Sequence, residues 1–362
     1  YEYVLTVRNH VGEAVSHPVR LLTLPAAPRN LSLYPVEREA GQIIASFDAV
    51  QSADSYRIVA FNMGSQQEVY NHTVTDNVYQ PVMNLQPGTV YNVTVSAINT
   101  TGEGPAGSQS ILSLPDAPNG FKSISIGENR VDLMWHSVTT ATYYALDRDG
   151  APVTESVYEA FSDMGLSSGT AYDYRLSAIN TTGAGTYSHM NVLTLPGMVN
   201  NLTIVEARRN ELLIAWNQVR GASGYRIVVN GVQEYMVGAY ELQATIPNLP
   251  SGTPAHISIQ ALNSSGLSVT SSAYGITLPD QLDEVDVSDI KERSAVLSWA
   301  PVHGATTYEI NVNDRKYTVS DTRLVVQGLS GGTAYHFHIT AGNTSGLGES
   351  LKGHFITRPT QV

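Results

Sequence analysis

Residues 329–346 read LSGGTAYHFHITAGNTSG: a leucine, a glycine-rich turn, an aromatic residue that opens a strand-like run, and an Asn-x-x-Gly turn. Stretches of the same design begin at Leu85 and Leu166. The second half of the design, an aromatic residue (once an alanine) followed by Asn and then Gly, occurs five times, with its asparagine at Asn9, Asn99, Asn180, Asn263 and Asn343. An interval of about 80 to 90 residues suits a small autonomous domain and is too long for a solenoid repeat. The chain is therefore predicted to be a string of similar domains.

A second landmark is an aromatic residue followed nine positions later by tyrosine. It occurs as Phe47…Tyr56, Trp135…Tyr144, Trp216…Tyr225 and Trp299…Tyr308. Short runs of Val, Ile, Thr and Tyr alternate with polar residues around it, which predicts antiparallel strands and no helix of ordinary length. A large ring at a fixed place in each domain is expected to fill a core between two sheets.

Two further patterns mark the ends of each repeat. A leucine, a turn and Thr-x-Tyr, as in Leu329…Thr333-Ala-Tyr335, suit a tyrosine corner, in which the tyrosine hydroxyl bonds to the upstream backbone. A closing tripeptide then occurs as Thr23-Leu-Pro25, Ser113-Leu-Pro115, Thr194-Leu-Pro196, Thr277-Leu-Pro279 and Thr357-Arg-Pro359. Proline has no amide hydrogen, so each tripeptide is expected to end strand pairing.

Taken in this order, the aromatic core residue, the Leu-x-x-x-Thr-x-Tyr corner and the Asn-x-x-Gly turn resemble the fibronectin type III family over essentially the whole chain. The resemblance implies an all-β tandem array of seven-stranded immunoglobulin-like β-sandwiches, in which the stretch from Tyr91 is strand F. The predicted organisation is a partial domain at 1–25 (strands F and G only), fibronectin type III-like domains at 26–115, 116–196, 197–279 and 280–359, and the start of a linker at 360–362. The partial domain would be a window cut from a longer array, or one completed by another molecule.

Two copies depart from this pattern. Phe47 stands where the other copies have Trp, which is a mild change. Ala255, preceded by Pro254, replaces the corner tyrosine of the third complete domain. That domain loses a ring and a hydrogen bond, so it is expected to be the least stable of the four.

Composition excludes several classes of partner. The formal net charge is −12 and the chain has no basic run, which argues against binding to nucleic acid or anionic lipid. Cysteine is absent, so each domain must be stable through core packing without disulfides. No run of 18 apolar residues occurs, so direct membrane insertion of this segment is not expected.

The motifs that suggest catalysis lie in the wrong context. Residues 165–169 and 328–332 both spell the Gly-x-Ser-x-Gly of hydrolases, but each lies at the corner before strand F with no helix behind it. Neither an enzyme nor a cofactor is therefore predicted. The resemblance would place an integrin-binding Arg-Gly-Asp on the F–G loop, and the sequence does not contain it.

Two sets of residues are candidates for metal binding. His336, His338 and His354 are expected on one exposed sheet face of the last domain and could bind Zn²⁺ or Cu²⁺, although solvated surface histidines are the more common case. The acidic residues Asp280, Asp283, Glu284, Asp286 and Asp289 gather near the last domain boundary. They suit either Ca²⁺ or a solvated strand face.

Asparagine sequons are the strongest functional signal. Eight Asn-x-Ser/Thr sites occur, at Asn30, Asn71, Asn92, Asn99, Asn180, Asn201, Asn263 and Asn343. They predict N-linked glycans and hence an extracellular chain, although turns also favour asparagine for its own sake.

The sequence therefore predicts a non-enzymatic extracellular structural or adhesive array: a glycosylated stalk, spacer or fibre segment cut from a longer repeat protein. Its predicted partners are other copies of itself in a fibre, or an unidentified surface protein. One alternative is the ectodomain of a receptor or adhesin that binds a protein through its loops. Another is the spacer module of a secreted polysaccharide-degrading enzyme.

Overall fold

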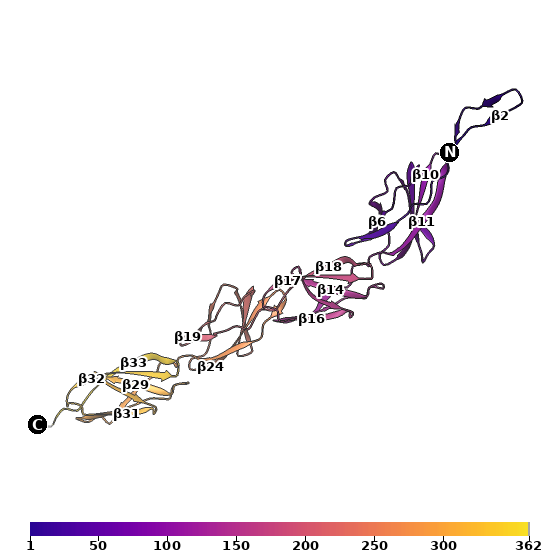
Figure 1. The fold of residues 1–362 in the computed structure, drawn as a ribbon. Helices are drawn as coiled ribbons and strands as arrows, with labels where there is room; N and C mark the ends of the chain where they lie inside the picture. Colours follow the sequence, from indigo (N-terminus) through magenta and orange to yellow (C-terminus); the bar gives the residue numbers. More distant parts are fainter. Residues whose placement is uncertain (361–362) are drawn as a thin grey trace. The chain divides into compact units, whose positions relative to one another are not determined.

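The computed structural model describes residues 1–360 and contains strands and turns, with no helix in that range (Figure 1). The predicted all-β fold is confirmed. No helix in the described range is long and apolar enough to cross a membrane. The chain divides into two compact units. The first comprises residues 1–125, 131–164 and 171–192, and the second comprises residues 126–130, 165–170 and 193–362.

Four β-sandwiches follow one another along the chain, each made of two antiparallel sheets. In sandwich 1 (residues 32–112), one sheet has the order β5-β6-β9 and the other β11-β10-β7-β8. Its strands are β5 Ser32–Val36, β6 Glu39–Ser46, β7 Ser55–Asn62, β8 Gln67–Val74, β9 Gln80–Val82, β10 Val90–Asn99 and β11 Gly102–Leu112. This is a seven-stranded sandwich, as predicted.

The same topology recurs in sandwiches 2 and 4. Sandwich 2 (residues 122–193) comprises β12 Lys122–Ile126, β13 Arg130–Met134, β14 Tyr143–Arg148, β15 Ala151–Ser156, β16 Ala160–Met164, β17 Ala171–Ile179 and β18 Ala184–Leu193. Sandwich 4 (residues 286–356) comprises β27 Asp286–Ser288, β28 Ser294–Ser298, β29 Thr307–Val312, β30 Arg315–Val319, β31 Arg323–Gln327, β32 Ala334–Asn343 and β33 Gly346–Ile356.

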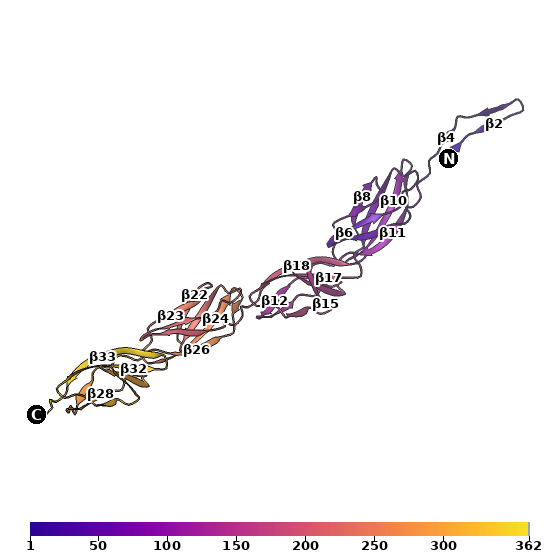
Figure 2. The ribbon, with the colours of Figure 1, turned by 60° about the vertical axis from the view of Figure 1, so that its left-hand side comes forward.

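Sandwich 3 (residues 203–276) differs because its last strand is interrupted. Its strands are β19 Thr203–Ala207, β20 Leu212–Ala215, β21 Gly224–Val229, β22 Gln233–Gly238, β23 Gln243–Ile246, β24 Pro254–Asn263, β25 Gly266–Leu267 and β26 Ser271–Ile276 (Figure 2). Both β25 and β26 pair with β24. The break lies at Ser268, whose hydroxyl accepts a hydrogen bond from the Ala261 N–H over 2.9 Å.

Residues 1–25 contain two short ladders of one hairpin. β1 (Glu2–Tyr3) pairs with β4 (Val19–Arg20), and β2 (Thr6–Arg8) pairs with β3 (Glu13–Val15). Every residue of these strands is exposed. That the hairpin is strands F and G of a partial domain stays a prediction, as do the domain boundaries.

Each sandwich is built around an aromatic pair, as the spacing of nine residues predicts. The rings are buried and meet edge to face, with centroids 4.9 Å apart for Phe47–Tyr56, 5.5 Å for Trp135–Tyr144, and 5.3 Å for both Trp216–Tyr225 and Trp299–Tyr308. Edge-to-face contact places the positive edge of one ring on the negative face of the other.

The tyrosine of each pair also closes a turn, which the sequence analysis did not foresee. Its hydroxyl accepts a hydrogen bond from the backbone N–H six residues earlier, as between Val50 and Tyr56 at 2.8 Å. The other three bonds are Val138 to Tyr144 at 2.8 Å, Val219 to Tyr225 at 3.0 Å, and Val302 to Tyr308 at 2.9 Å. The predicted tyrosine corners are present at Tyr91 and Tyr335, whose hydroxyls accept from Gln86 N–H at 2.7 Å and Ser330 N–H at 2.8 Å.

Ala255 occupies the corner position of sandwich 3 and is buried in the core. Its methyl group can neither accept the corner hydrogen bond nor fill the volume of a tyrosine ring. We therefore expect sandwich 3 to unfold first, with a stability deficit of about 1 kcal/mol or more. Sandwiches 2, 3 and 4 each hold one tryptophan, so variants that retain a single Trp report their thermal unfolding separately. A melting temperature for the Trp216 reporter above those of Trp135 and Trp299 would contradict the expectation.

Candidate functional site: the domain junctions

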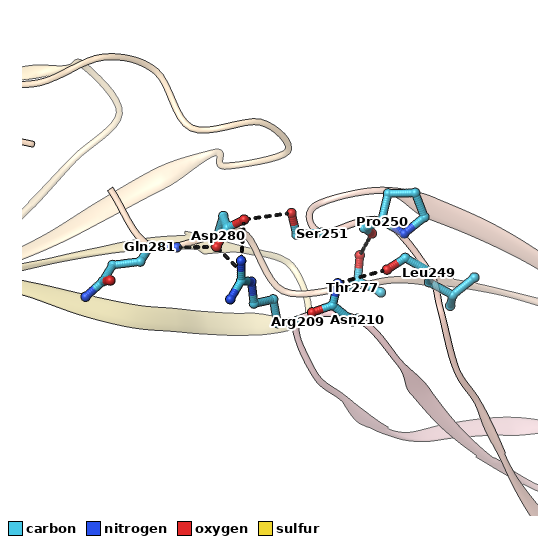
Figure 3. Close-up of polar contacts among 8 residues, drawn as sticks. All are labelled: Arg209, Asn210, Leu249, Pro250, Ser251, Thr277, Asp280 and Gln281. Carbon is cyan, nitrogen blue, oxygen red and sulfur yellow. Dashed lines mark hydrogen bonds and ion pairs between the residues drawn. The ribbon is translucent and has the colours of Figure 1, made fainter. Parts of the chain in front are cut away.

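The closing Thr or Ser of the last four tripeptides holds the corner of its own sandwich. The fully buried hydroxyl of Thr277 donates to the Pro250 carbonyl over 2.6 Å (Figure 3). It also accepts from the Thr253 N–H over 3.0 Å. One hydroxyl thus pairs a backbone acceptor and a backbone donor that would otherwise be buried without partners. The same pair of bonds is made by Ser113 with Gln86 and Thr89, by Thr194 with Ser167 and Thr170, and by Thr357 with Ser330 and Thr333.

The carbonyl of the same closing residue is the acceptor for the next domain. The side-chain Nδ2 of the asparagine in each Asn-x-x-Gly turn donates to it, and we call this contact the junction clamp. All four distances are 2.8 Å: Asn99 to Thr23, Asn180 to Ser113, Asn263 to Thr194, and Asn343 to Thr277. The first two clamps lie inside the first unit and the last two inside the second.

The other end of each clamp amide fixes its own turn. The Oδ1 atom accepts the backbone N–H two residues on, over 2.8 Å from Thr101 and 2.9 Å from Thr182, Ser265 and Ser345. This local bond is the reason asparagine suits such a turn. Asn99, Asn180 and Asn263 are buried and Asn343 is half-buried. Both ends of the side chain are therefore committed, one to the turn and one to the preceding domain.

Glycines let the backbones approach at the clamp. Gly185 lies so near the Pro115 carbonyl that a Cβ atom would be 2.0 Å from its oxygen. Gly104 and Gly348 stand in the same relation to Pro25 and Pro279, at 2.1 and 2.4 Å. In sandwich 3 this position is Ser268, which coincides with the break in its last strand.

A second backbone contact lies beside the clamp in the second unit. Gly252 and Gly304 are packed so closely that a Cβ on Gly304 would be 2.0 Å from the Gly252 oxygen. Gly169 and Gly221 pack in the same way, with a corresponding distance of 2.1 Å. Such contacts exclude every side chain except hydrogen.

The last junction also contains an ion pair. Arg209 Nε lies 2.8 Å from Asp280 Oδ1, and Ser251 donates to Asp280 Oδ2 over 3.3 Å (Figure 3). The Asp280 carboxylate is therefore paired with the Arg209 guanidinium. Among the residues that the structure describes, no group of three or more His, Cys, Asp or Glu side chains could hold a metal ion.

The structure brings two of the three candidate histidines together. His336 and His354 are partners in the β32–β33 ladder, with ring centroids 6.0 Å apart. His338 lies opposite Lys352 instead. His336 and His338 alternate with buried residues on β32 and share its exposed face, and a metal site at these residues stays a prediction.

A buried polar group in sandwich 2 was missed by the sequence analysis. Asp163 accepts hydrogen bonds from Arg148 Nη1 to both carboxylate oxygens, at 2.8 and 2.7 Å, and from the Tyr174 hydroxyl at 2.7 Å. Counted along the repeats, these residues replace apolar core residues: Asp163 stands where Val82, Ile246 and Val326 stand in the other sandwiches. A comparison of the four copies would have revealed this exchange.

Tyr174 makes this group sensitive to high pH. Burial, followed by the hydrogen bond to Asp163, raises the pKa of the Tyr174 phenol above its ordinary value. Because the folded state holds this proton more tightly than the unfolded chain, the stabilisation is complete below the unfolded pKa of about 10 and is lost as pH rises through the folded pKa. We expect the urea midpoint of sandwich 2, reported by Trp135, to fall above about pH 10. A Tyr174→Phe variant should show a smaller fall, and equal falls in both proteins would contradict this assignment.

Comparison with known proteins finds the fibronectin type III domain at residues 26–112 and 280–355. Tenascin of Gallus gallus is 23% identical over 395 residues, covering 100% of this chain and 21% of that protein. Receptor-type tyrosine-protein phosphatase eta of Mus musculus is 21% identical over 262 residues, covering 70% of this chain and 21% of that protein. The chain thus spans about a fifth of the length of these two curated relatives.

Two solved structures are also similar. The crystal structure of chicken CNTN1 FN1-FN3 domains has a TM-score of 0.29 and 20% identity, covering 67% of this chain and 99% of that one. A two fibronectin type III domain segment from chicken tenascin has a TM-score of 0.30 and 21% identity, covering 44% of this chain and 99% of that one.

Proposed function

Because residues 26–112 and 280–355 match the fibronectin type III domain, we propose that the chain is a non-enzymatic extracellular array that acts as a stalk, spacer or fibre segment. Its function would lie in the fixed succession of its domains. The observation that carries this proposal is the junction clamp, which recurs at 2.8 Å in four places along the chain. Independent domains on loose tethers would not need an amide that donates to the preceding domain and a close glycine contact at each boundary.

The relatives and the sequons support an extracellular location. The matched proteins are a tenascin and a receptor-type phosphatase, so a similar chain is expected outside the cell or at its surface. The eight sequons make N-linked glycans the first predicted partners. A fibre of this chain would add other copies of itself, and the net charge of −12 disfavours nucleic acid.

A second candidate is the ectodomain of a receptor or adhesin. Receptor-type tyrosine-protein phosphatase V of Rattus norvegicus is 25% identical over 392 residues and covers 100% of this chain. In that setting the same array would hold a binding loop at a set distance from the membrane. Both candidates depend on junctions that keep neighbouring domains in a fixed relation.

Double electron–electron resonance distances between two spin labels test the premise that both candidates share, that the junctions fix neighbouring domains. The chain has no cysteine, so Thr245→Cys in sandwich 3 and Arg323→Cys in sandwich 4 give two unique label sites on exposed strand positions of the second unit. A junction held by the Asn343 clamp and the Gly252–Gly304 contact should give one narrow distance distribution. A distribution as broad as that of two domains on a flexible tether would overturn the proposal.

A further inference from the structure

We propose that N-linked glycans attach to Asn71 and Asn92, on one sheet face of sandwich 1, and that the four junction-clamp sequons stay unmodified. The proposal rests on the extracellular location proposed above. It divides eight sequons that look alike in the sequence into groups with different structural roles.

The clamp sequons are disfavoured because the nitrogen that a glycan needs is packed against the preceding domain. A glycan replaces one of the two hydrogens of the asparagine side-chain nitrogen, and in each clamp this nitrogen lies against the carbonyl of the preceding closing residue, to which it donates over 2.8 Å. Asn180 is 4% exposed, Asn99 5% and Asn263 8%. The remaining hydrogen could still donate, but a sugar on Asn99, Asn180 or Asn263 would need room that the buried side chain does not leave. We therefore expect a folded junction to disfavour a glycan at its clamp.

The backbone conformation at Asn30 and Asn201 favours asparagine. Their φ angles are 54° and 55°, in the left-handed region that favours Gly and Asn. Sandwich 2 has Gly120 with a φ of 68° at the same place before its first strand. The sequons at Asn30 and Asn201 are thus accounted for by the turn, with no need of a glycan.

No positive φ angle accounts for asparagine at Asn71 and Asn92. Both lie on strands with ordinary φ, and Asn71 pairs with Val59 while Asn92 pairs with Phe61. Val59 and Phe61 are two apart on β7, so both asparagines are on the outer face of the same sheet. The Asn92 side chain makes no hydrogen bond within the described residues, and the residue is half-buried.

The environment of Asn71 is also open. Its Nδ2 donates to Glu68 over 2.8 Å and its Oδ1 accepts from Arg57 over 3.0 Å, and these contacts lie at the exposed surface of one sandwich. A glycan on Asn71 would displace only the hydrogen bond to the exposed Glu68 side chain. Phe61 lies half-buried on the same face, so sugars on the two asparagines would cover apolar surface that the sheet leaves open.

Site occupancy in the full chain, secreted from mammalian cells behind a leader peptide, tests the proposal. Enzymatic removal of glycans in H₂¹⁸O marks every occupied asparagine for peptide mass spectrometry. The mark is expected at Asn71 and Asn92 and absent at Asn99, Asn180, Asn263 and Asn343. Thr73→Ala and Thr94→Ala, which remove the two sequons without touching either asparagine, should each lower the mass by one glycan. Thr182→Ala and Ser345→Ala, which remove two clamp sequons and leave the clamp asparagines, should not change the number of attached glycans.

The outcomes separate this proposal from the proposed function. Marked clamp asparagines, or glycan loss in Thr182→Ala, would overturn the division of sequons while leaving the array extracellular. Glycosylation at neither Asn71 nor Asn92 would overturn the assignment of the glycan face. The spin-label distance within the second unit is measured on protein without glycans, so a broad distribution would count against the array function alone.

Discussion

Replacing Asp163 by alanine is expected to destabilise sandwich 2 by about 3–5 kcal/mol, because it leaves the Arg148 guanidinium and the Tyr174 hydroxyl without their common acceptor. The Asp163 side chain is 5% exposed and that of Arg148 is 32% exposed, so part of the arginine charge can still reach water. The loss is nevertheless a large share of the free energy of unfolding of a typical domain, which is about 5–15 kcal/mol. Urea denaturation, followed by Trp135 fluorescence in a Trp216→Phe, Trp299→Phe background, measures this loss of stability in sandwich 2.

Two controls separate the lost ionic group from a general effect of mutation. Glu155→Ala removes an exposed carboxylate from the neighbouring β15 and should change stability by no more than about 0.5 kcal/mol. The triple variant Arg148→Val, Asp163→Val, Tyr174→Ile gives sandwich 2 apolar residues like those of the other copies. A well-packed apolar replacement of a buried ionic group is often neutral or stabilising, so the triple variant should recover the stability lost in Asp163→Ala. Equal midpoints for Asp163→Ala and Glu155→Ala would show that the group contributes nothing.

Gly304→Ala is expected to release the junction between sandwiches 3 and 4. A Cβ at this position would lie 2.0 Å from the Gly252 oxygen, so the two backbones must separate. The left-handed φ of 71° at Gly304 adds about 1–2 kcal/mol of strain to the alanine variant inside sandwich 4. The distance distribution between labels at positions 245 and 323 should therefore broaden or shift.

Gly231→Ala is a matched control for the strain. Gly231 has a φ of 73°, but an added Cβ would meet no atom within 4 Å. Alanine there should cost a similar amount of stability in sandwich 3 and leave the label distances unchanged. If Gly304→Ala and Gly231→Ala give the same narrow distribution, the glycine contact does not fix the junction.

The sequence predicts what lies within one repeat and misses what lies between repeats. The spacing from Trp216 to Tyr225 sets a ring pair on adjacent strands, and the structure shows that pair at 5.3 Å. Asn263, by contrast, donates to a carbonyl 69 residues earlier, and no local pattern distinguishes that bond from an ordinary turn or a sequon. Long-range polar contacts depend on the final placement of whole domains, which strand periodicity does not encode.

The candidate sites divide in the same way. His336 and His354 were expected opposite each other across a turn, and antiparallel register places them so. His338 lies two residues from His336 on the same exposed face of β32, with Lys352 opposite it. Asp163 was overlooked because an acidic residue in a strand is usually solvated, whereas here it occupies a core position and its partners come from two other strands.

Thr194 has a double role that bears on how such arrays change over evolutionary time. Its hydroxyl completes one domain and its carbonyl receives the amide of the following one. Every clamp uses the same two chemical groups, and the acceptor is a main-chain atom that any residue provides. A copy that is duplicated, deleted or moved within the gene therefore meets a compatible neighbour at either end. The array can change its length and order without inventing a new interface.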